Sequence, residues 1–265
     1  MAVKALEVLL LVGAGAYLAL LIYGVFLSES AMFQPHPASY RDGVEIIKLT
    51  SRDGARISAA YLPNADARYT LLFCHGNAED LGDDLPLLAE LRRAGFAVFI
   101  FDYQGYGTSQ GRPTEQHTYD DADAAYDYLT GPLKVPANRI IAVGRSLGSA
   151  VCVDLATRRP VAGLILQSAF TSAFRVVTQV PILPFDKYRS LAKIRNIHVP
   201  VLVIHGTADE VVPFSHGEKL FAASNQPKRS LWVQGGDHNS LTMHAGARYF
   251  TTLQAFARLV EAEQK

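Results

Sequence analysis

Three residues in the second half of the chain have the types and order needed for nucleophilic acyl transfer: Ser146, Asp209 and His238. A serine becomes a nucleophile when a histidine accepts its proton and a carboxylate holds the histidine ring. Folds that place such a serine at a sharp strand-to-helix turn have these residues in the chain order Ser, then Asp or Glu, then His. The three residues therefore predict a serine hydrolase with an acyl-Ser146 intermediate, in which His238 is the general base and Asp209 orients it.

Ser146 lies at the centre of GRSLG, residues 144–148, which matches the G-x-S-x-G pattern of a nucleophile elbow. Residues 140–143 are a short apolar run rich in β-branched residues, typical of a strand buried on both faces. After Ser146, small and apolar residues recur at helical spacing for about three turns. A strand that turns into a helix at this point is the context the motif requires, so we expect Ser146 at the tip of a central strand.

Both partners of the serine follow apolar runs, as expected for residues at the carboxyl ends of parallel strands. Asp209 comes after the run at 201–204, and His238 comes after the run at 231–233. Two other carboxylates and one other histidine remain as alternatives: Glu210, Asp237 and His244.

The oxyanion of an acyl-transfer intermediate needs backbone N–H donors beside the serine. The third expected strand ends at HGNA, residues 75–78, and we assign the N–H groups of Asn77 and Leu147 as the two donors. A tight turn between strand and helix is the alternative interpretation of HGNA. His75 and His205 also follow strands, but they precede the acid in the chain, so we interpret both as structural.

Residues 102–109, DYQGYGTS, close the next expected strand, and their glycines let the backbone cross the rim of the site. We expect Tyr103, Tyr106 and Arg145 to line the pocket, with turn geometry alone as the alternative reason for residues 102–109. Acyl transfer by Ser, His and Asp needs neither a metal nor an organic cofactor, so none is expected.

Apolar runs alternate with helical patterns along the chain, which predicts one α/β domain at residues 32–265. We expect a mostly parallel eight-stranded sheet with helices on both faces, begun by a hairpin at Asp53-Gly54. Strands are expected at residues 44–49, 57–62, 69–74, 97–101, 140–143, 163–166, 201–204 and 231–233. Helices are expected at residues 80–93, 118–129, 146–158, 215–223 and 244–261. Only about thirty residues separate the sixth and seventh strands, so the cap should be minimal and the site open.

Composition excludes some functions. The 265 residues carry 25 basic and 25 acidic side chains, and no basic run is interleaved with aromatic residues, so a nucleic-acid partner is not expected. Cys74 and Cys152 form no metal-binding pair and are interpreted as small buried apolar residues.

Residues 8–27 contain no charged side chain and, at about 1.5 Å per residue, are long enough to cross the roughly 30 Å core of a bilayer. We expect residues 1–31 to form a single-pass membrane anchor. A cleaved signal peptide is the main alternative, because Ser28 and Ser30 precede Ala31 in a small-x-small pattern. A buried helix of a soluble protein is the second alternative to an anchor.

The flanking charges bear on orientation. Lys4 precedes the apolar run and Glu29 follows it, which favours a cytoplasmic N-terminus and a catalytic domain on the non-cytoplasmic side. Residues 32–41, with Pro35 and Pro37, should form an extended connector to the domain.

Together, the motifs HGNA, DYQGYG, GRSLG, HGTADE and GDHN resemble the α/β-hydrolase superfamily, in particular its membrane-tethered abhydrolase-domain branch. The resemblance covers about residue 33 to the C-terminus. That branch includes protein depalmitoylases and bacterial relatives, which implies an acyl ester or thioester substrate such as a lipid or a lipidated protein. Its depalmitoylases are held at membranes by lipidated N-terminal cysteines, whereas this chain has an apolar span there.

Two other functions remain open at this point. A serine peptidase or amidase would use the same triad, and a non-catalytic binding protein would keep the fold and hold a ligand in the pocket. Dehalogenase and epoxide-hydrolase chemistry is disfavoured because those reactions use an aspartate where this chain has Ser146.

Overall fold

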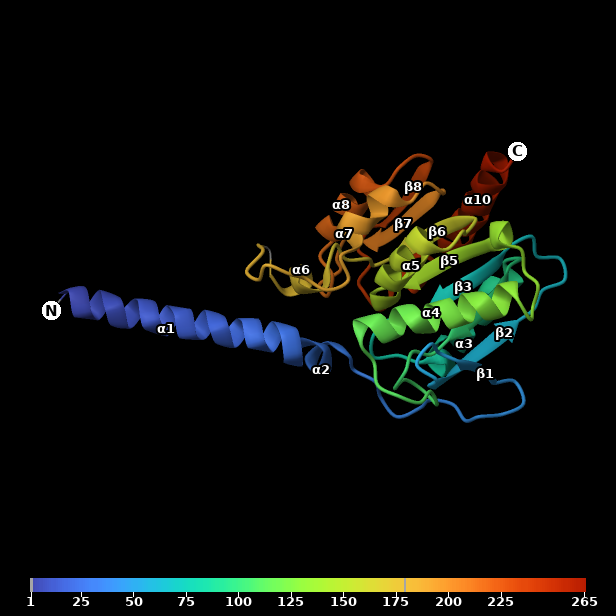
Figure 1. The fold of residues 1–265 in the computed structure, drawn as a ribbon. Helices are drawn as coiled ribbons and strands as arrows, with labels where there is room; N and C mark the ends of the chain where they lie inside the picture. Colours follow the sequence, from blue (N-terminus) through green and yellow to red (C-terminus); the bar gives the residue numbers. More distant parts are fainter. Residues whose placement is uncertain (1, 179) are drawn as a thin grey trace.

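The structure is a computed structural model that describes residues 2–178 and 180–265. In these residues one eight-stranded sheet has the order β1-β2-β4-β3-β5-β6-β7-β8 (Figure 1). β1 (Ile47–Thr50) pairs antiparallel with β2 (Arg56–Leu62), β2 pairs antiparallel with β4, and all other neighbours are parallel. The parallel strands are β3 (Thr70–Cys74), β4 (Ala97–Phe101), β5 (Ile140–Arg145), β6 (Gly163–Gln167), β7 (Val201–Gly206) and β8 (Lys228–Val233). The predicted mostly parallel eight-stranded sheet is confirmed.

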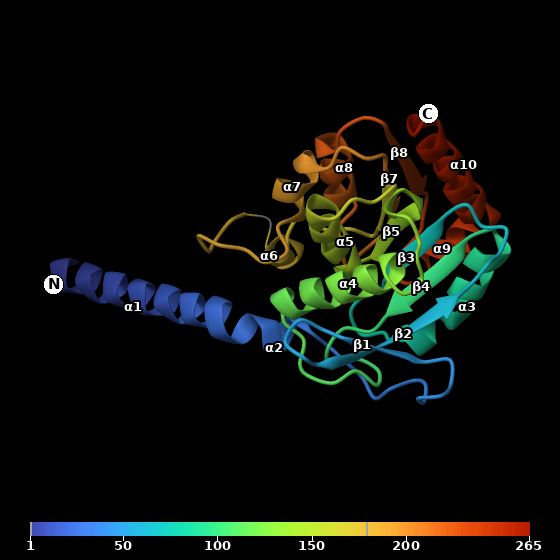
Figure 2. The same ribbon diagram turned by 45° about the vertical axis from the view of Figure 1, so that its right-hand side comes forward.

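Helices cover both faces of this sheet, as Figures 1 and 2 show. One apolar core lies under α4 (Glu115–Thr130), α5 (Leu147–Arg158) and α8 (Ser215–Ala223). A second core lies on the opposite face under α3 (Leu81–Arg93) and α10 (Ala247–Glu263). Two covered faces explain why the central strands are apolar without alternation.

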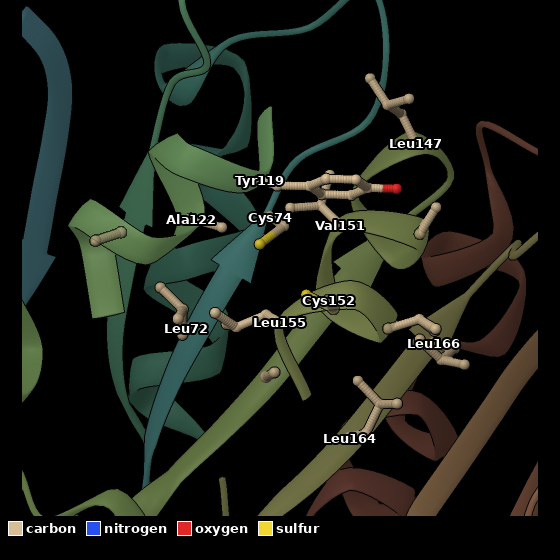
Figure 3. Packing of buried hydrophobic residues seen from close by; sticks show 14 of the residues in the cluster. Leu72, Cys74, Tyr119, Ala122, Leu147, Val151, Cys152, Leu155, Leu164 and Leu166 are labelled. Carbon is tan, nitrogen blue, oxygen red and sulfur yellow. The ribbon is translucent and has the colours of Figure 1, made fainter. Parts of the chain in front are cut away.

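β3 shows how one strand serves both cores. Leu72 and Cys74 belong to the first core and Leu71 and Phe73 to the second, because successive side chains of a strand point to opposite faces. Above the first face, α5 presents a stripe of side chains with helical spacing, which Figure 3 shows together with Leu72 and Cys74. That stripe fixes α5 against the centre of the sheet.

Glycines allow α5 to lie this close to the strands. A Cβ atom at Gly148 would overlap the backbone carbonyl of Cys74, and one at Gly144 would overlap the backbone of Gly148 and Ser149. Backbone atoms in a packed sheet cannot give way as the end of a flexible side chain can. The two glycines of GRSLG are therefore required by the packing of the turn around the serine.

Several boundaries differ from the sequence-based expectation. α4 begins three residues earlier than expected, because the side chain of Thr114 caps it by accepting a hydrogen bond from the N–H of His117 at 3.0 Å. The helix expected at 244–261 is two helices, α9 (Leu241–Ala245) and α10, separated by Gly246 with φ +53°. β1 begins only at Ile47, since Val44 is fully exposed.

The segment between β6 and β7 is short. It holds α6 (Ala173–Val177), α7 (Ser190–Lys193) and a 3₁₀ turn at Ile194–Asn196. The expectation of a minimal cap is confirmed.

The N-terminal helix projects away from the domain (Figure 1). It consists of α1 (Ala2–Ile22), a π-helical turn (Tyr23–Leu27) and α2 (Ser28–Met32). Val3–Met32 is long and apolar enough to cross a membrane, and little of it is buried against the protein.

Gly148→Ala should destabilise the domain, because the added methyl group meets the backbone of β3. We expect about 3 kcal/mol or more of lost stability, and a thermal unfolding midpoint about 10 °C lower in detergent. Gly43→Ala is the matched control, since nothing lies within 4 Å of a Cβ atom there. Equal midpoints for the two variants would contradict the proposed close packing.

Candidate active site

The structure brings Ser146, His238 and Asp209 together at the carboxyl ends of β5, β8 and β7. The Oγ atom of Ser146 lies 3.0 Å from Nε2 of His238, and Nδ1 of His238 lies 2.8 Å from Oδ2 of Asp209. These distances suit transfer of a proton from the hydroxyl to the imidazole while the carboxylate holds the ring. The parallel strands align these three chain positions, which are far apart in sequence, at one edge of the sheet.

Ser146 has a strained backbone, with φ +50° and ψ −113°. A residue with a Cβ atom rarely adopts such a conformation, which costs on the order of 1–3 kcal/mol. Hydrogen bonds hold it there: its N–H donates to the carbonyl of Gln167 at 2.9 Å, and its own carbonyl accepts from the N–H and Oγ of Ser149. The strain points the half-buried hydroxyl away from the sheet toward His238.

Asp209 has no exposed side-chain surface and is surrounded by hydrogen-bond donors. Burial opposes its ionisation, but hydrogen bonds from His205, His238 and the N–H of Val212 outweigh burial and lower the pKa of Asp209 below its usual value. With a depressed pKa, the carboxylate stabilises the fold above the usual aspartate pKa, and this contribution disappears as the pH falls through the depressed value. Asp209 is thus an anion when His238 becomes positively charged.

The alternative carboxylates Glu210 and Asp237 and the alternative histidine His244 make no hydrogen bond with Ser146 among the described residues. Glu210 is exposed, and Asp237 uses its carboxylate to accept the N–H groups of Asn239 and Ser240, both at 2.8 Å. His244 is exposed on α9 and bonds Ser240.

The two histidines interpreted as structural are both fully buried. Burial lowers the pKa of His75 to about 4, so its ring is neutral, and Nδ1 lies 2.7 Å from the carbonyl of Gly76. His205 lies behind Asp209, with Nε2 2.9 Å from the carbonyl of Val212 and 3.4 Å from Oδ2 of Asp209. Both rings support loops of the site.

The loop after β3 lies against the serine. A Cβ atom at Gly76 would be 3.5 Å from the Cβ atom of Ser146. The N–H of Gly76 donates to the carboxylate of Glu79, whereas the N–H groups of Asn77 and Leu147 have no acceptor among the described residues. Leu147 is the first residue of α5, where N–H groups point out of the helix. These two free donors are the ones an oxyanion would need.

Glu79 is a supporting residue that the sequence analysis missed. Its carboxylate binds both the N–H of Gly76 and the guanidinium of Arg145, which also lies 3.3 Å from Asp84. Through Glu79, Arg145, the residue before the nucleophile, is therefore tied to the loop after β3, and its expected pocket-lining role stays a prediction. No sequence pattern marks Glu79 as a partner of Gly76 and Arg145, so these contacts could not be predicted.

The side chain of Asn77 fixes the same loop to the connector from the N-terminal helix. Its Nδ2 donates to the carbonyl of Met32 at 2.7 Å, and its Oδ1 accepts from the N–H of Gln34 at 3.0 Å and from the hydroxyl of Tyr106 at 2.5 Å. The end of the apolar helix is thus in direct contact with the loop beside Ser146.

Tyr103 and Tyr106 do not line the pocket as expected. Both are buried, at 0% and 1% exposure, and pack against His75 with ring centroids 4.3 and 5.4 Å apart. The hydroxyl of Tyr103 donates to the carbonyl of His75 at 2.9 Å. Each tyrosine therefore packs under the loop after β3. Both lie on a buried turn, so neither side chain reaches the surface where a substrate would bind.

One group of side chains has ligand atoms close enough for a metal ion. His36, Asp80 and Asp83 place such atoms within 4.8 Å of one another. These groups already have partners: Asp80 and Asp83 form the capping box of α3, and His36 pairs with Asp83 at 2.9 Å. They belong to the connector and the start of α3 and not to the triad.

The fold matches known esterases. The esterase Pf2001 of Pyrococcus furiosus superposes with a TM-score of 0.74 at 16% identity, covering 87% of this chain and 98% of that structure. A family profile described as serine aminopeptidase, S33 (Hydrolase_4) matches residues 65–193. Fold and family together define a serine ester hydrolase with the α/β-hydrolase fold.

Sequence relatives define the family more closely. Human alpha/beta hydrolase domain-containing protein 17B is 38% identical over 234 residues, which are 87% of this chain and 80% of the relative. The uncharacterized protein Rv2307c of Mycobacterium tuberculosis is 38% identical over 218 residues, 79% of this chain and 78% of the relative. The chain belongs to the family of alpha/beta hydrolase domain-containing protein 17.

Asn77→Ala should slow hydrolysis by loosening the loop that carries the proposed oxyanion donor. We expect kcat to fall about tenfold with little change in KM, less than the roughly 10²–10³ that loss of an oxyanion donor costs. Tyr106→Phe removes one of the three hydrogen bonds of the Asn77 side chain and should lower kcat less. Tyr69→Phe is the control, because that hydroxyl lies away from the site and makes a long 3.4 Å contact with Gln264. Unchanged kcat in Asn77→Ala would show that the side chain does not position the loop.

Proposed function

We propose that this protein is a membrane-anchored serine hydrolase that cleaves an ester or thioester of an acyl substrate through an acyl-Ser146 intermediate. The observation that carries the proposal is the unbroken set of contacts from Ser146 through His238 to Asp209, at 3.0 and 2.8 Å. The free N–H groups of Asn77 and Leu147 beside the serine support the same chemistry.

Acylation begins when His238 takes the hydroxyl proton of Ser146 and Oγ attacks the substrate carbonyl. The negative charge that develops on the carbonyl oxygen is stabilised by the N–H groups of Asn77 and Leu147. As the tetrahedral intermediate collapses, the bond to the leaving group breaks, and His238 gives its proton to the departing alcohol or thiol. Asp209, held as an anion, stabilises the positively charged imidazole in between.

Deacylation repeats these steps with water. His238 takes a proton from the water, the hydroxide attacks the acyl carbonyl, and His238 returns the proton to Oγ of Ser146 as the carboxylic acid leaves. All proton transfers use His238 alone.

An acyl group attached to a membrane lipid or to a lipidated protein is the substrate that best suits this architecture. The catalytic domain follows an apolar helix long enough to cross a bilayer, and a membrane anchor raises the effective concentration of substrates held at the same surface. The resemblance to the branch that contains protein depalmitoylases supports an acyl thioester or ester in particular.

A retained anchor suits the structure better than a cleaved signal peptide. Ser28 is buried, and Glu29 binds Lys187 of the cap at 3.0 Å. Met32 bonds Asn77, and Phe33 is buried in the core. Cleavage before Ala31 would separate Ser28 and Glu29 from the contacts that they make with the domain.

Replacing the three proposed catalytic residues should abolish turnover. We expect kcat on a p-nitrophenyl acyl ester to fall about 10⁶-fold in Ser146→Ala and in His238→Ala and about 10⁴-fold in Asp209→Asn. A fluorophosphonate probe should label the wild type and not Ser146→Ala. The matched controls Ser230→Ala, His244→Ala and Glu210→Gln change exposed residues and should keep wild-type rates. Wild-type labelling in Ser146→Ala would show that another residue is the nucleophile.

Substrate panels separate ester cleavage from peptide cleavage, which the serine aminopeptidase description of the matched family raises. We expect purified full-length protein to turn over acyl esters and acyl thioesters faster than aminoacyl or peptide amides. Release of amino acids from peptides without ester or thioester turnover would replace the proposed function with a peptidase.

Membrane fractionation tests the anchor. We expect the full-length chain to remain in the membrane pellet after an alkaline carbonate wash, with an intact N-terminus by mass spectrometry. The flanking charges favour a domain on the non-cytoplasmic side. Protease added to spheroplasts of a bacterial expression host should then digest the domain. A soluble product that begins near Ala31 would identify the segment as a signal peptide.

A further inference from the structure

A mostly apolar cavity of about 320 Å³ lies between the N-terminal helix and the cap segment after β6. Its helix side includes Leu20, Gly24, Ser28 and Ala31, and its cap side includes Ala173, Leu183 and Arg175, whose guanidinium pairs with Asp186. The cavity lies within the usual size range of small-ligand sites, which are concave and mainly apolar. It is separate from the triad residues and has no role in the catalytic steps described above.

Four of the residues on the helix side of the cavity follow one another along the helix. Leu20, Gly24, Ser28 and Ala31 are spaced by three or four residues, which places them above one another. At Gly24 an added Cβ atom would lie 2.6 Å from Leu183, so the glycine lets the cap approach the helix backbone. In Figures 1 and 2 the segment around α6 extends from the domain toward the N-terminal helix.

One residue of the cavity wall is bonded to the active-site loop. Met32 lines the cavity, and its carbonyl accepts the 2.7 Å hydrogen bond from Asn77. Asn77 follows Gly76, which packs against Ser146. Met32 therefore contacts both the cavity and the loop that carries the proposed oxyanion donor.

The other end reaches into the apolar span. The uncharged run ends at Leu27, and Glu29 marks the start of the polar surface through its bonds to Lys187 and to the N–H of Glu115. Leu20 lies nine residues before Glu29, about 13 Å along the helix axis. The cavity therefore extends from Met32, which bonds the active-site loop, to Leu20 within the apolar span.

We infer that this cavity holds the hydrocarbon chain of a membrane-borne acyl ester or thioester while its carbonyl is attacked by Ser146. The inference rests on the proposed function and adds the route of the substrate, which enters sideways from the bilayer along the anchor helix. An acyl chain that enters the cavity leaves a lipid environment and is then surrounded by apolar side chains. It need not cross water on its way to the serine. The anchor helix is then one wall of the substrate site as well as a tether.

Chain-length profiles of pocket-filling variants test this inference. Full-length protein in detergent is assayed on p-nitrophenyl esters from acetate to palmitate. Each variant is compared with the wild type on the same ester, so that partitioning of the ester into detergent micelles cancels in the ratio of their kcat/KM values. Ala31→Phe and Ala173→Phe should lose at least about tenfold more kcat/KM on palmitate than on acetate, because burial of each methylene is worth about fourfold. Leu183→Ala widens the cavity and should raise the palmitate-to-acetate ratio.

Ala19→Phe is the matched control, since Ala19 is exposed on the same helix and does not line the cavity. It should leave the whole profile unchanged. The inference is overturned if both phenylalanine variants show the same loss on every ester, or if neither shows a loss. Failure of the proposed function would look different, because wild-type protein would then turn over no ester at any chain length and would not react with a fluorophosphonate.

Discussion

The backbone of Ser146 is held in a conformation that it would not adopt in a free chain, and the rest of the site depends on this. The turn requires β5 to end at Arg145, just before the serine, and α5 to begin at Leu147, just after it, directly over the sheet. That approach is possible only because Gly144 and Gly148 lack side chains where the backbones meet. The energy that holds the strained residue comes from the packing of α5, from the hydrogen bond of its N–H to Gln167 of β6 and from those of Ser149 to its carbonyl, so the core of the fold is what exposes the nucleophile.

Two sets of contacts connect this turn to the remaining parts of the site. Arg145 and Glu79 connect the nucleophile turn to the loop after β3, and the Asn77 side chain connects that loop to Met32 and Gln34. The consequence is that the proposed oxyanion donor is positioned partly by the end of an apolar helix. A change in the position of this helix would therefore act on the loop through hydrogen bonds of 2.7 and 3.0 Å.

Much of the fold was predictable because its signals are local. Buried parallel strands are short apolar runs, and each expected run became a strand, with shifts of a few residues at the ends. The errors occurred where one residue changes the local geometry. Gly246 interrupts a continuous helical pattern through its positive φ, Thr114 starts α4 earlier through its cap, and β8 begins at charged residues of an exposed strand that no apolar run marks.

The sequence by itself determined the order and spacing of the chemical groups: a serine between two glycines, an aspartate and a histidine each following an apolar run, and an uncharged span of bilayer length. These are properties of neighbouring residues, so they can be read without coordinates. Only the tertiary structure decided that Glu79 holds Gly76, that Tyr103 and Tyr106 are buried below the loop, and that the N-terminal helix and the cap enclose a cavity beside Met32. Apart from the short Glu79–Gly76 bond, these arrangements bring together residues far apart in the chain, and they arise from how the helices, the cap and the sheet pack, which no local pattern encodes.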